Sequence, residues 1–145
     1  AGAAAPDFYV VGSKVTDEIR ALEQPGNGII IKGFVSEEEL ERLYAECRIV
    51  VVPLRYGAGV KGKVVEAIYN GAPIVTTSIG AEGIPQVEDV LVVEDEPEQF
   101  AQAVADLYQN EAACRELCER TQRYIREHFS MDAAWRVIEE DFCRR

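Results

Sequence analysis

Basic side chains are scarce in this sequence. It holds 15 lysines and arginines against 26 aspartates and glutamates, which gives a formal net charge of −11 at pH 7. Nucleic acid and anionic membranes would meet a repulsive mean field at such a protein. The composition therefore argues against nonspecific binding to either, and we expect no nucleic-acid partner.

Metal-ligand patterns and long apolar runs are also missing. The sequence has a single histidine, His128, and its four cysteines form no CxxC pair, so reduced, partly buried thiols are favoured over a zinc site. No apolar stretch approaches the roughly 20 residues that cross a bilayer, and the first residues lack the basic and apolar regions of a signal peptide. These absences predict a cytoplasmic protein.

The remaining composition, 48% apolar and 28% charged residues, is typical of a globular protein with a packed core. Apolar, β-branched runs alternate with helical periodicity up to residue 93, which is typical of a parallel sheet with helices on both faces. We predict strands over residues 8–11, 29–31, 49–54, 74–77 and 91–93, with helices over residues 16–23, 37–47 and 61–70. A helical C-terminal tail follows, over residues 97–109, 111–129 and 132–142. No linker interrupts this α/β pattern, so one compact unit is expected.

Acidic residues are distributed unevenly along the chain. Between Glu46 and Glu82 there is one, Glu66, although the same window holds four basic residues, Arg48, Arg55, Lys61 and Lys63. Two predicted buried strands explain why acids are missing there, because buried strands avoid charge. They explain less well why cations cluster around glycines.

Those glycines, Gly57, Gly59 and Gly62, lie between a predicted strand and a predicted helix. Such a loop lets an anion approach the main chain, and the open N–H groups and dipole of the helix start favour negative charge, as do nearby ammonium groups. A pyrophosphate suits this place. The pattern is neither GxxxxGK[ST] nor GxGxxG, so it predicts neither a P-loop nor the common dinucleotide site. A simple tight turn is the alternative.

Glu66 follows on the same predicted helix. A carboxylate beside a nucleotide commonly accepts hydrogen bonds from ribose hydroxyls. The alternative is a surface pair with Lys63 three residues earlier, which would contribute only a few tenths of a kcal/mol. As the lone acid of the window, Glu66 fits the binding role better.

Three blocks of sequence carry a resemblance to a known family: GFVS at residues 33–36, VVPLRYGAGVKGKVVEA at residues 51–67 and GAPIVTT at residues 71–77. They resemble the donor-binding domain of GT-B glycosyltransferases of family four, the group 1 family. The resemblance spans nearly the whole chain. It implies that residues 1–145 form a nucleotide-sugar binding domain, the Rossmann-like C-terminal half of a GT-B fold.

The resemblance also implies roles for individual residues. The ribose hydroxyls would be bound by Glu66, and the nucleobase would lie against Val35 and Glu37. The donor diphosphate would be held by Arg55, Gly57, Gly59, Val60, Lys61, Gly62 and Lys63. The basic residues among them would neutralise the leaving diphosphate as the glycosidic bond breaks, a form of transition-state stabilisation.

The implied reaction is retaining transfer of a sugar from a UDP- or GDP-sugar to an acceptor, with no metal ion or other cofactor. One departure concerns the sugar: the family has a second glutamate eight residues before Glu66, and this sequence has Ala58 there. A loop around Gly80 and Glu82, after the fourth predicted strand, could face the donor, because loops at the carboxyl ends of parallel strands line the ligand crevice. An exposed loop acid is about equally expected for Glu82.

A second departure concerns length. Family members have an N-terminal acceptor domain, and their donor domain begins with a strand and a helix that have no counterpart here. The chain is therefore expected to be a fragment that is inactive alone and that could self-associate through an incomplete sheet. The full-length enzyme would lie free in the cytoplasm or peripheral to a membrane.

Two other functions remain open on the sequence. The chain could be a non-catalytic nucleotide-binding or regulatory module with this fold. It could also belong to a nucleotide-sugar epimerase, but such an enzyme needs acid and base residues in its cleft, and Glu66 and Glu82 are almost the only candidates.

Overall fold

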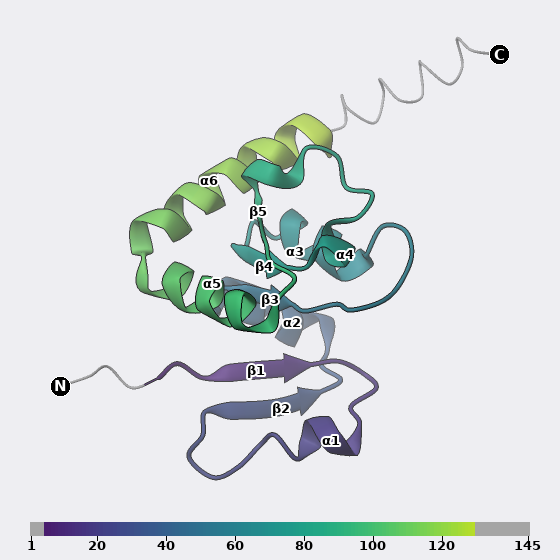
Figure 1. The fold of residues 1–145 in the computed structure, drawn as a ribbon, viewed down its shortest axis with the longest axis vertical. Coiled ribbons are helices and arrows are strands. Elements are labelled where there is room, and N and C mark those ends of the chain that lie inside the picture. The colour runs from purple at the N-terminus through teal and green to yellow at the C-terminus, as the bar shows by residue number, and fades with distance from the viewer. Residues whose placement is uncertain (1–4, 130–145) are drawn as a thin grey trace. The chain divides into compact units, whose positions relative to one another are not determined.

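A computed structural model describes residues 5–129 of the chain, which is divided into two compact units, Ala1–Ala45 and Glu46–Arg145 (Figure 1). The single compact unit expected from the sequence is therefore wrong. The division follows the hydrogen bonding, because the described strands form two sheets, β1-β2 and β3-β4-β5. No linker of glycine, proline or serine marks this boundary, which is why it could not be predicted from the sequence. The helix predicted over residues 132–142 lies outside the described residues.

The first unit is built on two parallel strands, β1 (Phe8–Val11) and β2 (Ile29–Gly33). The helix between them, α1 (Asp17–Arg20), is shorter than predicted. Its continuation is prevented by Asn27, whose side chain donates to the Leu22 carbonyl at 2.7 Å, and by the nearby Pro25. The unit ends in α2 (Glu37–Glu46), whose start is capped by the Ser36 hydroxyl, which accepts from the Glu39 N–H at 3.1 Å.

The second unit contains three parallel strands in the order β3 (Val50–Val52), β4 (Ile74–Thr76) and β5 (Leu91–Val93). Five helices accompany them: α3 (Gly62–Tyr69), α4 (Ser78–Ala81), the 3-10 helix η1 (Val87–Asp89), α5 (Pro97–Gln109) and α6 (Glu111–His128). Figure 1 shows α5 and α6 joined as a helical hairpin along this sheet.

The core of the second unit is centred on β4. Its residues alternate between the two faces of the sheet, yet Ile74, Val75 and Thr76 are all fully buried, so both faces are covered. Val75 packs with Leu107 of α5 and with Cys114 and Leu117 of α6, while α3 contacts both β3 and β4. The predicted α/β fold, with parallel strands, helices on both sides and a helical C-terminal segment, is confirmed.

Two short elements were not predicted. Residue 77 was expected to end a strand, but Thr77 instead caps α4: its hydroxyl accepts from the Gly80 N–H at 3.2 Å. The helix η1 follows within the same connection. In β3, ladder pairing ends at Val52 rather than at residue 54, because Pro53 has no N–H to donate.

Candidate functional site

The residues expected at the nucleobase lie in the first unit. Val35, half-buried, and Glu37, exposed at the first position of α2, both follow the turn that Gly33 makes at a φ of +65°. In the sequence, Phe34 lies between the end of β2 and these two residues. Its aromatic side chain is 80% exposed and was not singled out from the sequence. The remaining candidate residues belong to the second unit.

The glycine-rich loop of the second unit runs from the end of β3 to the start of α3. Gly57 and Gly59 have φ values of +124° and +75°, a region that other residues rarely adopt, so the loop needs glycine at both positions. Lys61 is the N-cap of α3 and makes no side-chain capping hydrogen bond. The N–H groups of Gly62 and Lys63 precede the first helical bonds, so they have no partner within the helix. The start of α3 is thus open to an anion.

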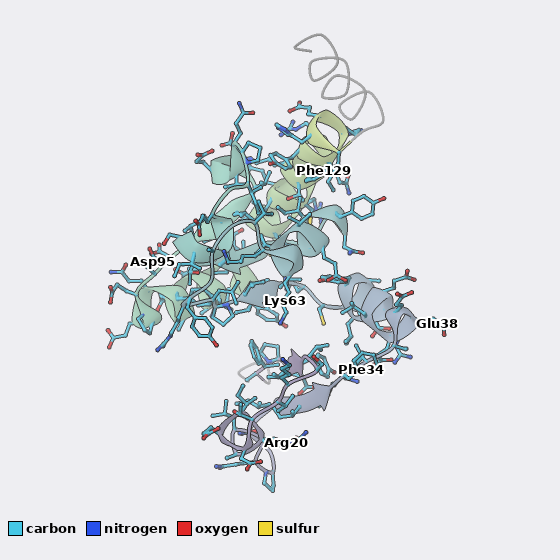
Figure 2. All side chains as sticks on the ribbon, turned by 90° about the vertical axis from the view of Figure 1, so that its right-hand side faces the viewer. Arg20, Phe34, Glu38, Lys63, Asp95 and Phe129 are labelled. Carbon is cyan, nitrogen blue, oxygen red and sulfur yellow. The ribbon has the colours of Figure 1, made fainter. Side chains whose placement is uncertain are left out.

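Helix α3 is oriented by its apolar face. Val64, Ala67 and Ile68, spaced three and four residues apart, are fully buried against the sheet. This orientation leaves Lys63 and Glu66 exposed, with Lys63 drawn at the start of the helix in Figure 2. Within residues 5–129 neither side chain forms an ion pair, so the alternative of a Lys63–Glu66 surface pair is wrong. Arg55, also exposed, likewise has no ion-pair partner in that range.

Lys61 behaves differently from the other basic residues. Its side chain is only 12% exposed and turns back into the loop, where its ammonium group donates to the Gly59 carbonyl at 2.5 Å. The same nitrogen lies 3.5 Å from the Glu82 carboxylate, which comes from the connection after β4. A Cβ atom at Gly57 would lie 3.0 Å from the Lys61 side chain, so this glycine also makes room for the lysine. The structure therefore brings two predicted site residues, Lys61 and Glu82, into contact.

The connection after β4 packs closely on its surroundings. Gly80 is buried in α4, and a Cβ atom there would lie 1.9 Å from the Thr76 hydroxyl oxygen. Gly83, with a φ of +77°, lies against Val60 of the glycine-rich loop. A Cβ atom added at Gly83 would lie 2.9 Å from the Val60 side chain. The loops that follow β3 and β4 thus touch at the carboxyl edge of the sheet.

Sequence reasoning missed the side chains that fasten these loops. The Thr76 hydroxyl donates to the Val52 carbonyl at 2.8 Å, and the Thr77 hydroxyl donates to the Leu54 carbonyl at 2.6 Å. Asp95, which follows β5 and is labelled in Figure 2, accepts from both the N–H and the hydroxyl of Ser78, at 2.8 and 2.9 Å. A signal was present, because polar residues directly after buried parallel strands lie at one edge of the sheet.

Two residues of α6, Cys118 and Tyr124, have raised pKa values. Burial raises the pKa of the Cys118 thiol, with smaller contributions from Cys114 and Glu119, which keeps it protonated at neutral pH. Cys114 and Cys118 are free thiols, as predicted, while Cys143 lies outside the described residues. Burial also raises the pKa of Tyr124, whose hydroxyl donates to the Pro85 carbonyl.

In residues 5–129, no group of three or more histidine, cysteine or acidic side chains is placed to hold a metal ion. Across the same range, every helix is too short or too polar to cross a membrane.

Comparison with known proteins supports the family resemblance carried by the three sequence blocks. A protein of Klebsiella pneumoniae described as "Uncharacterized 44.6 kDa protein in cps region" is 31% identical over 105 residues. That alignment covers 72% of this chain, and the chain spans 27% of the relative's length. Residues 3–110 match the family described as glycosyl transferases group 1. Since this match includes well over half of the sequence, the chain belongs to the group 1 glycosyltransferases.

Proposed function

We propose that this chain is the donor-binding domain of a retaining glycosyltransferase that uses a UDP- or GDP-linked sugar. The observation that carries the proposal is the start of α3, which is open to an anion and follows a loop with two glycines at positive φ. The family of the chain, the group 1 glycosyltransferases, agrees with this. Backbone N–H groups and the helix dipole at that point favour a diphosphate. The exposed side chains of Arg55 and Lys63 add positive charge from the same segment.

Each group in the second unit would have a separate task. The N–H groups of Gly62 and Lys63 would bind diphosphate oxygens, and the cations would offset the charge that develops when the sugar leaves. Glu66, exposed and without an ion-pair partner in residues 5–129, would accept hydrogen bonds from the ribose hydroxyls. Because protein cations and N–H groups offset the charge, the proposed reaction uses no metal ion.

The remaining parts of the proposal concern the whole enzyme. Since the chain spans 27% of the curated relative, a further part of the protein would supply the acceptor, and the chain alone would bind donor without transferring the sugar. Val35 and Glu37 would lie at the nucleobase. We propose a cytoplasmic enzyme, free or peripheral to a membrane.

Calorimetric titration with UDP and GDP tests the site. One of the two should bind, and Glu66→Gln should weaken binding by about 10-fold or more, because a hydrogen bond to a charged group contributes about 1.5–3 kcal/mol. The matched control is Glu111→Gln, which removes an exposed, ion-paired carboxylate of α6 and should bind as the original chain does. EDTA should leave the affinity unchanged.

Three results would contradict the proposal. Neither nucleotide binds at millimolar concentration, Glu66→Gln binds as tightly as its control, or EDTA abolishes binding. A crystal soaked with the bound nucleotide would then show whether the ligand lies at residues 57–63 or elsewhere.

A further inference from the structure

The ion pair between Lys61 and Glu82 is unusual among those of the second unit. In the described part of that unit, residues 46–129, the other two pairs are Glu111 with Arg115 and Glu116 with Arg120, which join residues four apart on the surface of α6. The Lys61–Glu82 pair instead joins two loops, and its two members differ in exposure, at 12% for Lys61 and 52% for Glu82. A mostly buried lysine side chain thus meets a carboxylate that is still in contact with solvent.

The ammonium group of Lys61 has three N–H donors, and the Gly59 carbonyl uses one of them. The Glu82 carboxylate lies 3.5 Å away, close enough for charge attraction but at the outer limit of a hydrogen bond. The backbone of Lys61 is also the N-cap of α3, where an anion is favoured. A negative oxygen therefore already lies next to the cation that a phosphate group would approach.

Release of this carboxylate would be inexpensive. Glu82 lies outside α4, at its C-cap, and half of its side chain is in solvent. Water therefore solvates the Glu82 carboxylate once it has turned away from Lys61. Gly59 would keep Lys61 in place after Glu82 has turned away, since the hydrogen bond to its carbonyl does not involve the carboxylate.

We propose that Glu82 is an internal counter-anion of the diphosphate site, which holds the charge of Lys61 until a donor phosphate takes its place. This inference rests on the proposed function and adds a regulatory contact to the same site. The Glu82–Lys61 pair and the bound diphosphate then exclude each other. Affinity for the donor is lowered by the charge of Glu82.

Titration of Glu82→Gln with UDP, GDP and inorganic pyrophosphate tests this. The variant should bind the diphosphates about three- to tenfold more tightly at low salt, because one negative charge beside the bound anion is removed. The gain should shrink at high salt, since solvent-exposed charges are screened. The control Glu111→Gln changes the net charge equally and should show no gain. In a Lys61→Met background, the effect of Glu82→Gln should be smaller.

A second measurement does not need a nucleotide. Acetylation of Lys61, followed by mass spectrometry, should be faster in Glu82→Gln than in the original chain, and pyrophosphate should slow it in both. Weaker or unchanged diphosphate binding by Glu82→Gln would overturn the inference. If pyrophosphate shows the gain but neither UDP nor GDP binds, the counter-anion stands and the proposed nucleotide donor fails. If no ligand binds any variant, both fail.

Discussion

Replacing Gly80 by alanine is expected to lower the free energy of unfolding by about 3 kcal/mol. The new Cβ atom would lie 1.9 Å from the hydroxyl oxygen of Thr76 and 3.2 Å from its Cβ atom. Thr76 is fully buried in β4 and cannot turn into solvent. Overpacking of a core costs about 1–3 kcal/mol, and loss of the hydrogen bond from Thr76 to Val52 adds about 1 kcal/mol.

Urea unfolding followed by circular dichroism measures this effect. The matched control is Gly62→Ala, because no heavy atom lies within 4 Å of a Cβ atom there and its φ is not positive. We expect that control to be neutral or to stabilise the chain by up to about 1 kcal/mol, since alanine favours helix over glycine. Adding Thr76→Ala to Gly80→Ala should restore part of the loss, because it removes the clashing hydroxyl. Equal midpoints for Gly80→Ala and its control would show that the contact is absent.

Truncating Ile68 to alanine should have a similar or larger effect. Its side chain is fully buried on the face of α3 that contacts the sheet. Removal of three carbon atoms from such a site costs about 2–5 kcal/mol, with the value set by how far the cavity collapses. Urea unfolding again gives the free energy.

The neighbouring position provides the control for that variant. The Tyr69 side chain is 67% exposed, so Tyr69→Ala should change stability by no more than about 0.5 kcal/mol. If the two variants unfolded at the same urea concentration, the assigned orientation of α3 would be wrong. That orientation determines which face carries Lys63 and Glu66, so the experiment also bears on the proposed ribose contact.

Most of the fold could be predicted because strands and helices repeat with different periods. The strands β1 and β5 and the helix α5 have the predicted limits, since β-branched runs or a proline at the first helical position mark them. The helix α4 could not be found this way, because four residues are too few to show a period. The division into two sheets depends on pairing between distant segments, which periodicity does not report.

The candidate site was predictable in part for a similar reason. Glycines and cations adjacent in the sequence identify a loop that suits an anion, and that loop does precede α3. The contact between Lys61 and Glu82 joins residues far apart in sequence, so it depends on how two loops pack. The sequence left Glu82 between two interpretations, and the structure shows that its carboxylate has a partner in the glycine-rich loop.

The hydrogen bonds from the Thr76 and Thr77 hydroxyls also anchor the backbone at the start of the glycine-rich loop. They hold the carbonyls of Val52 and Leu54, on either side of Pro53, and Lys61 caps the start of α3 at the other end of the loop. The segment between these anchors, residues 55–60, is therefore short. Ordering a residue costs about 1–2 kcal/mol of conformational entropy, so a short free segment keeps this penalty on binding small.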